Sequence, residues 1–509
     1  MELNLQRQQV AISDVIYDGA VEQPIECDAL LPDYCPDIVK ILKCSVSVHI
    51  HSNQVSGNRL TAEGVSTAHV YYSSGGSAIR RTEYKLPFTK NIDLREAPEA
   101  PIVRIIPKLD YVNCRAVNQR RIDIRGALTL QVKVISCRQE TVISGASGGG
   151  IQLRRDMVGV TEIQKRTETP FSIQEELECG YGKPPIGSII RSEAKVNLLD
   201  HKTVAGKIVL KGELLLHVSY HPVESEELEI MKYNLPVSQI IDCDGVTEDS
   251  RCHVRVNVGE CSVSPVADEA GEYKNFRLEA GLRASVTTHV NKEIPVASDC
   301  YSTDFECSGQ VRPVAFQKLV DIVKETALQK ISLELPENIG SIMDAWCQPT
   351  GSKWVMDGAV MEVETELMVS ILAKMNDGEG MYFEQQASMT HRITLTEGGE
   401  GIMFDPDFDI LSTDYSLQGK ERIDMRVEIA LGGSVYRTIR RNAIGEIQLD
   451  ENTKKRKESN RLFLYYAGEG ESVWEIAKHY NTSPNLIWEE NALEHDLLPG
   501  RIMLMIPIV

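Results

Sequence analysis

The sequence predicts a mainly β protein, with three tandem antiparallel β repeats followed by a small β-α-α-β module. Three observations support this fold class. Strand-like patterns recur three times at matching spacings over residues 1–450. Helical periodicity is sparse in that region, while β-branched residues and turn-rich gaps are frequent. The remaining residues, 462–509, change to a short apolar strand, two helical patterns and a closing strand.

The repeat is recognised by its spacing. A similar short segment opens each copy, at residues 36–41, 185–189 and 338–342. Ile38 and Gly64 are 26 residues apart, and the same separation joins Ile186 to Gly212 and Ile339 to Thr365. The second residue of each pair lies within a matching strand pattern, at residues 60–72, 208–220 and 360–373. Agreement in both spacing and pattern indicates a triplication.

Further strands follow in the same order in each copy. The second strand lies around Leu86, Leu235 and Ala387. Pro87 and Pro236 predict an edge strand or a bulge there, because proline has no N–H to donate. Paired runs then close each copy, at 103–113 with 121–134, 254–263 with 276–290, and 408–417 with 422–431. Residues 314–330 fit a helix or a strand about equally well.

The predicted domains are repeats at residues 1–150, 151–308 and 309–450, a linker at 451–461 and the module at 462–509. We expect the repeats to be small β-sandwiches or partly open barrels arranged like beads. The linker region is charge-rich and lacks apolar residues from 451 to 460, which favours a flexible connection. The glycines at 148–150 are not followed by a phosphate-binding helix and are interpreted as a loop.

Charge and composition narrow the function classes. With 54 basic and 74 acidic residues the net charge is −20, which argues against nucleic acid as a partner. No run resembles a signal peptide or a transmembrane segment, so we expect the chain to stay in the compartment where it is made. The 12 cysteines form no Cys-x-x-Cys pair and are expected to be thiols. Cys27, Cys35 and Cys44 are too widely spaced for a zinc knuckle, although contact in three dimensions stays open.

Catalytic and cofactor motifs do not emerge from the sequence. It contains no nucleophile elbow, phosphate loop or dinucleotide fingerprint, so we expect no enzyme, no catalytic residue and no cofactor. His49 and His51 lie on one face of a predicted strand but lack a third nearby ligand, so no metal site is predicted. The acidic segment 405–409 lacks the glycine and glutamate of a calcium loop, which favours a solvated acidic loop.

The C-terminal module shows clear boundaries. Residues 462–467 form an apolar strand, and the segment 472–475 predicts a capping box in which Ser472 and Glu475 cap each other's amides. Ser483 and Pro484 predict the start of a second helix that ends near residue 491. A Pro-Gly turn then leads into a closing strand at 502–506.

This module resembles a LysM domain along its whole length. The resemblance rests on Tyr465, Gly470 to Trp474, Ile476, Ala477, Tyr480, Asn491, Leu498 to Gly500, Ile506 and Pro507. LysM domains hold N-acetylglucosamine units in a shallow groove between two loops. The resemblance places that groove at Gly470, Glu471, Ser472, Val473, Leu497, Leu498, Pro499 and Gly500. Trp488 fits a core residue and an exposed contact residue about equally well, and it is a further candidate because tryptophan is enriched in binding hot spots. The usual Gly-Asp-Thr of the family is Gly-Glu-Ser here.

The order of β repeats, charged linker and terminal LysM resembles the SPOCS-domain spore-coat proteins of endospore-forming Firmicutes. In that family the protein lies in the mother cell at the forespore surface, and its LysM domain grips the coat ATPase SpoIVA. The resemblance implies a non-enzymatic scaffold for coat assembly, and repeated β units also offer surfaces for self-association. The alternative is a cell-wall protein whose LysM groove binds peptidoglycan through its N-acetylglucosamine units. Retention on purified peptidoglycan distinguishes the two.

Overall fold

The fold is mainly β, as the sequence predicts. The computed structural model describes residues 3–76, 78–225, 227–248, 250–336, 339–419, 422–455 and 462–507. In those ranges the helices are two short ones close to the C-terminal end, and every other regular element is a strand. No helix in the described ranges combines the length and the apolar character needed to cross a membrane.

Each repeat begins and ends with a long strand. The first repeat comprises β1 (Asn4–Leu30), β2 (Lys40–Ser56), β3 (Arg59–Ser73), β4 (Ile79–Asp93), β5 (Ile102–Asn118) and β6 (Arg121–Ser147). The second comprises β7 (Ile151–Glu178), β8 (Ile186–Val204), β9 (Lys207–Pro222), β10 (Glu229–Asp242), β11 (Arg251–Ala267) and β12 (Tyr273–Ser302). The third comprises β13 (Phe305–Glu334), β14 (Ile339–Asp357), β15 (Val360–Met375), β16 (Gly380–Thr394), β17 (Ile402–Phe404), β18 (Asp407–Gln418) and β19 (Arg422–Lys454).

The strands of each repeat form two antiparallel sheets that face each other. In the first repeat the strand orders are β2-β3-β4 and β1-β6-β5, and the second repeat has β8-β9-β10 with β7-β12-β11. The third has β14-β15-β16, and β19 pairs with β13, β17 and β18. The two sheets enclose a separate apolar core in each repeat, exemplified by Leu60 with Ile124, and by Leu214 with Phe276. Each repeat is therefore a β-sandwich.

The three strand patterns that define the repeat are confirmed as β3, β9 and β15, the central strands of the three-stranded sheets. They bury alternate residues because one face of each strand meets the core of its sandwich. Pro87 and Pro236 lie in β4 and β10, which are edge strands, as expected of residues without an N–H. The paired closing runs are also confirmed, as β5 with β6, β11 with β12, and β18 with β19.

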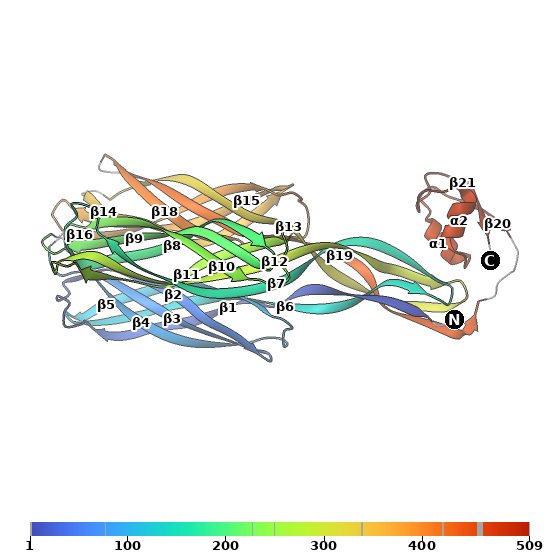
Figure 1. The fold of residues 1–509 in the computed structure, drawn as a ribbon, viewed down its shortest axis with the longest axis horizontal. Helices are drawn as coiled ribbons and strands as arrows, with labels where there is room; N and C mark the ends of the chain where they lie inside the picture. Colours follow the sequence, from blue (N-terminus) through green and yellow to red (C-terminus); the bar gives the residue numbers. More distant parts are fainter. Residues whose placement is uncertain are drawn as a thin grey trace.

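The first and last strands of each repeat extend past its sandwich as a two-stranded ribbon. The ribbons end at the pairs Asn4 with Ser147, Ile151 with Ser302 and Phe305 with Lys454. All three ribbons pack together through one shared apolar cluster, consisting of Val10, Ile12, Val142, Val158, Val160, Ile294, Val296, Val314, Phe316 and Ala443. We call this bundle of ribbons the stalk. It runs to the right in Figure 1, away from the three sandwiches.

The expected arrangement of the repeats as beads is wrong. Figure 1 shows the blue, green and yellow-to-orange sandwiches side by side. Away from the shared stalk cluster, a second apolar cluster joins the repeats through Tyr71 and Ile79 of the first, Ile190 of the second, and Met343 and Leu372 of the third. The alternating pattern of a strand shows that one face is buried, but not whether its own repeat or a neighbour covers it.

The structure resolves one ambiguous segment and corrects one predicted boundary. Residues 314–330 lie in β13 and are strand rather than helix. β19 continues to Lys454, so the first residues of the expected flexible linker, 451–454, are strand instead. Residues 456–461 of that linker lie outside the described residues. The glycines at 148–150 form a turn between β6 and β7, as expected, and all three have positive φ, which suits residues without a Cβ.

Candidate functional site

The C-terminal module has the predicted β-α-α-β order. It comprises β20 (Leu462–Ala467), α1 (Val473–His479), α2 (Pro484–Asn491) and β21 (Ile502–Pro507). β20 and β21 pair antiparallel, and both helices pack against one face of this pair. The core includes Val473, Trp474, Ile476, Ile487, Leu498, Leu504 and Ile506. Pro484 is the first residue of α2, where its missing N–H costs no hydrogen bond.

The predicted capping box is wrong. Ser472 occupies the N-cap position of α1, but its side chain makes no capping hydrogen bond. Its hydroxyl instead donates to the Asp496 carboxylate at 2.7 Å. The other oxygen of Asp496 accepts from the backbone N–H of Trp474 at 2.9 Å and caps the helix. A charged acceptor at a helix N-terminus also interacts favourably with the helix dipole, so Asp496 replaces the cap that the local sequence predicts.

The two loops predicted to form the groove do lie together. The backbone N–H of Gly470 donates to the Leu498 carbonyl at 2.9 Å, and the N–H of Leu498 donates to the Glu471 carbonyl at 3.0 Å. Next to these bonds, Ser472 and Leu497 form an isolated antiparallel bridge. The structure therefore brings residues 470–473 and 497–498 into direct contact. Because these backbone groups are bonded to each other, they are not free to bind a ligand.

Exposure divides the predicted groove residues into a rim and a floor. Leu497 is 60% exposed, and Gly470 and Pro499 are also exposed. Val473 and Leu498 are buried in the module core. Glu471 accepts a hydrogen bond from the Tyr465 hydroxyl at 3.0 Å. This hydrogen bond to the carboxylate raises the pKa of Tyr465.

Trp488 and Gly500 are less directly part of the groove. Trp488 is half-buried on α2 and packs against the module core, so it is partly a core residue. Its buried indole Nε1 has no hydrogen-bond partner among the described residues. Gly500 is half-buried, and a Cβ added there would meet open space. Neither residue shows a contact that ties it to the two loops.

An exposed apolar face on the module was not predicted from the sequence. Leu462, Leu464 and Tyr466 of β20 are 56%, 58% and 78% exposed, and Met503 of β21 is 48% exposed. Tyr466 pairs directly with Met503 across the two strands. We call these four residues the outer face, since the helices cover the other side of the sheet. The signal was present in the sequence. A strand with one exposed face usually alternates apolar and polar residues, whereas β20 has apolar or aromatic residues at every position.

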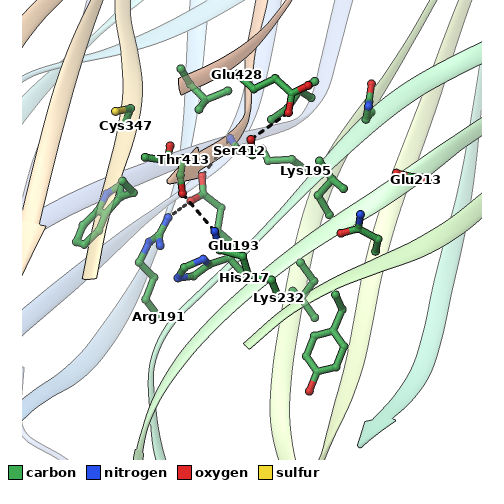
Figure 2. A pocket seen from close by; sticks show the side chains of 18 of the residues that line it. Arg191, Glu193, Lys195, Glu213, His217, Lys232, Cys347, Ser412, Thr413 and Glu428 are labelled. Atoms are coloured by element: carbon green, nitrogen blue, oxygen red, sulfur yellow. Dashed lines mark hydrogen bonds and ion pairs between the residues drawn. The ribbon is translucent and has the colours of Figure 1, made fainter. Parts of the chain in front are cut away.

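A cavity lies elsewhere, between the second and third repeats. It has a volume of about 400 Å³ and is lined by residues of β8, β9, β10, β14, β18 and β19. Figure 2 shows Arg191, Glu193 and His217 gathered at one side of it. Arg191 Nη1 and His217 Nε2 both lie 3.3 Å from the fully buried Asp344 carboxylate. Arg191 also pairs with Glu193.

These charges compensate one another. Burial alone would raise the pKa of Asp344, but the Arg191 guanidinium and the His217 hydrogen bond outweigh it and the pKa lies below its ordinary value. The Arg191 guanidinium additionally stacks on the Trp346 ring, 4.4 Å from its centroid. The charged groups of the cluster are therefore paired with one another across the second and third repeats. We interpret the cavity as part of the interface, or seam, between these repeats.

The segment 405–409 is not the solvated loop that was expected. Asp407, at the start of β18 in the third repeat, accepts a hydrogen bond from Arg104 of the first repeat at 3.2 Å. It also pairs with Arg255 of the second repeat. One carboxylate thus joins all three repeats, and its side chain is only 15% exposed.

No group of three or more metal-ligating side chains occurs in the described ranges, His49 and His51 included. All 12 cysteines are free thiols.

The fold shows that this protein belongs to the class built from tandem copies of one β-sandwich domain. The family model of the SipL, SPOCS domain matches residues 37–117 and 185–266, which cover β2 to β5 of the first repeat and most of β8 to β11 of the second. The first two repeats therefore contain SPOCS domains, and this domain family is related to sporulation. The third repeat has the same strand order as the two matched ones, apart from the additional short strand β17. No curated protein and no solved structure matches the chain.

Proposed function

We propose that this protein is a non-enzymatic scaffold for spore-coat assembly, located in the mother cell at the forespore surface. Its C-terminal module is a LysM-like head that binds a coat ATPase of the SpoIVA type. The match of the first two repeats to a sporulation-related domain family supports the setting. The compensated charge clusters at the seams between repeats support a structural rather than a catalytic role for the body.

The outer face is the observation that carries the proposal. Four large apolar side chains lie exposed on a sheet of only two strands, and Leu497 of the loop rim is a further exposed apolar side chain of the module. A contiguous apolar surface on a small module is typical of protein-binding sites. Tyrosine, methionine and leucine can supply the buried centre of an interface, and tyrosine in particular is enriched among residues that dominate binding energy.

The loops favour a protein partner over a sugar. A glycan needs hydrogen-bonding groups that are free to meet its hydroxyls. Here the N–H groups of Gly470 and Leu498 are bonded across the loops, and Glu471 is bonded to Tyr465. What the rim offers instead is apolar, through Leu497 and Pro499. The loops therefore support the coat-protein partner, and the N-acetylglucosamine alternative becomes an outcome of the test.

The test measures binding of the full chain to purified SpoIVA by biolayer interferometry, with Leu464→Lys and Tyr466→Lys as variants. We expect each to weaken binding by about tenfold or more, because a central apolar contact contributes roughly 1.4 kcal/mol or more. Leu199→Lys on β8 is the matched control, since Leu199 is 53% exposed and β8 lies among the sandwiches, away from the module in Figure 1. Wild-type affinity for both head variants would contradict the proposed binding surface.

The same instrument tests the glycan alternative. The chain is offered a chitin oligomer, and the groove variants Glu471→Lys and Leu497→Lys are compared with the outer-face variants. Binding of SpoIVA without binding of the oligomer supports the scaffold function. Binding of the oligomer alone, lost in the groove variants, would reject it and favour a wall protein that recognises N-acetylglucosamine.

A further inference from the structure

The C-terminal module touches the tip of the stalk through a defined polar contact. Asp299 of β12 accepts from the Trp474 indole N–H at 2.8 Å and from Lys478 Nζ at 2.7 and 2.9 Å. Asp299 follows a register shift between Ala297 and Asp299 in the pairing of β12 with β7. A bulge changes the direction of the side chains at that point, which explains how a strand residue can face a separate module.

Tyr301, two residues further along β12, completes the core of the module. Its side chain is buried, 3% exposed, within the same apolar cluster as Val473 and Ile487. Its ring meets the Trp474 ring edge to face, with centroids 5.0 Å apart. Its hydroxyl donates to the Thr482 carbonyl at 2.6 Å. A stalk residue thus contributes both an aromatic contact and a buried hydrogen bond to the head.

Three further contacts surround this anchor. Arg154 of β7 lies 3.5 Å from the Asp496 carboxylate, the group that caps α1. Ser483 donates to the side-chain carbonyl of Gln152, also on β7, at 3.3 Å. Lys455, which directly follows β19, donates to Asn481 at 2.7 Å. The contact therefore uses the second ribbon together with the end of the third, and it reaches several separate parts of the module.

We infer that the module is a fixed head docked on the stalk, and that Asp299 and Tyr301 are the residues that position it. Domains joined by a short segment move independently unless their interface is well packed. Here the interface contains a buried aromatic anchor and a carboxylate that accepts three hydrogen bonds. The body and the head therefore act as one oriented unit.

Docking also restricts where a partner can bind, a consequence that rests on the proposed function of the head. The stalk occupies the side of the module that carries Trp474, Lys478 and Thr482. The outer face and the Leu497 rim keep their large exposed areas with the stalk in place. A protein partner with apolar side chains ringed by basic residues fits this remaining side, because the described module residues 462–507 carry seven acidic side chains against two Lys and Arg.

Hydrogen exchange followed by mass spectrometry tests docking in the full chain, without any partner. The variants are Asp299→Ala, Asp299→Asn and Tyr301→Ala, with Glu293→Ala as the matched control on the exposed part of the same strand. We expect peptides covering residues 473–483 to exchange about threefold or more faster in Asp299→Ala and Tyr301→Ala. Asp299→Asn keeps an acceptor for the Trp474 indole and should lie between wild type and Asp299→Ala.

Reactivity of Lys478 towards an acetylating reagent gives a second readout. It should rise in Asp299→Ala and stay unchanged in Glu293→Ala, because Asp299 pairs with Lys478. Unchanged exchange and unchanged Lys478 reactivity in all three variants would overturn the inference. If Tyr301→Ala disturbs the stalk itself, the two Asp299 variants still show whether the head is docked on the stalk. These measurements use no SpoIVA, so they can confirm docking even when SpoIVA does not bind. Failure of the docking inference is therefore distinguishable from failure of the proposed function.

Discussion

The carboxylate of Asp496 joins two parts of the head, Ser472 and the first turn of α1, and also lies next to Arg154 of the stalk. We predict that Asp496→Ala lowers the stability of the head by about 1–2 kcal/mol, because a helix cap and a second hydrogen bond are lost together. Exchange rates of the α1 amides in the full chain measure this loss. Ser472→Ala is the comparison and should cost less, since it removes one hydrogen bond and leaves the cap. Equal effects would contradict the assignment of Asp496 as the cap.

His289 is a single residue that makes the contact between the second and third repeats sensitive to acid. It lies in the second repeat, 1% exposed, and its Nε2 is 2.7 Å from the Tyr436 hydroxyl of the third repeat. Burial lowers the pKa of His289 from 6.5 to about 4. The unfolded chain therefore binds a proton first as the pH falls, so stability is full above pH 6.5 and is lost progressively towards pH 4.

We predict that this residue alone removes about 2 kcal/mol of stability between pH 7 and pH 5. His289→Gln cannot be protonated and should show a correspondingly smaller loss over that interval, even if it is less stable at pH 7. Urea unfolding at the two pH values measures the difference. Identical pH dependence of the variant and the wild type would show that His289 is not buried in its neutral form.

At the scale of elements, local pattern and three-dimensional structure agree where contacts are close in sequence. The central strand β9, the edge position of Pro236 and the start of α2 at Pro484 all follow from neighbouring residues. The prediction failed where the partner is distant. Ser472 meets Asp496, 24 positions away, instead of Glu475. The stalk was missed because a ribbon shows the same alternation as a strand inside a sandwich.

The candidate site was predicted in part for the same reason. The two groove loops were located from a family resemblance, and the structure brings residues 470–473 and 497–498 together. The outer face was overlooked because β20 was interpreted only as a short apolar strand, without asking which of its side chains are exposed. Tyr301 carried no signal, since a tyrosine in a β-strand is ordinary and its contact with Trp474 joins residues far apart in the chain.

At the scale of the whole molecule, the stalk turns three homologous sandwiches into one body. Its apolar cluster draws residues from all three repeats, and Asp407 pairs with an arginine from each of the other two. Because each repeat loses part of its buried surface when another unfolds, we predict a single cooperative transition for residues 1–455. Independent beads would instead show up to three transitions. Differential scanning calorimetry compares the two, through the ratio of the calorimetric to the van't Hoff enthalpy.

Phe316→Ala provides the decisive perturbation of this shared cluster. Phe316 is fully buried where the three ribbons meet, and its truncation should cost about 3–5 kcal/mol. In a cooperative body the whole transition moves to lower temperature, although the substitution lies in the third repeat only. Leu367→Ala, fully buried inside the sandwich of the third repeat, is the matched variant and should move the same transition. A shift confined to one of several resolved transitions would mean that the repeats are energetically independent despite their contacts.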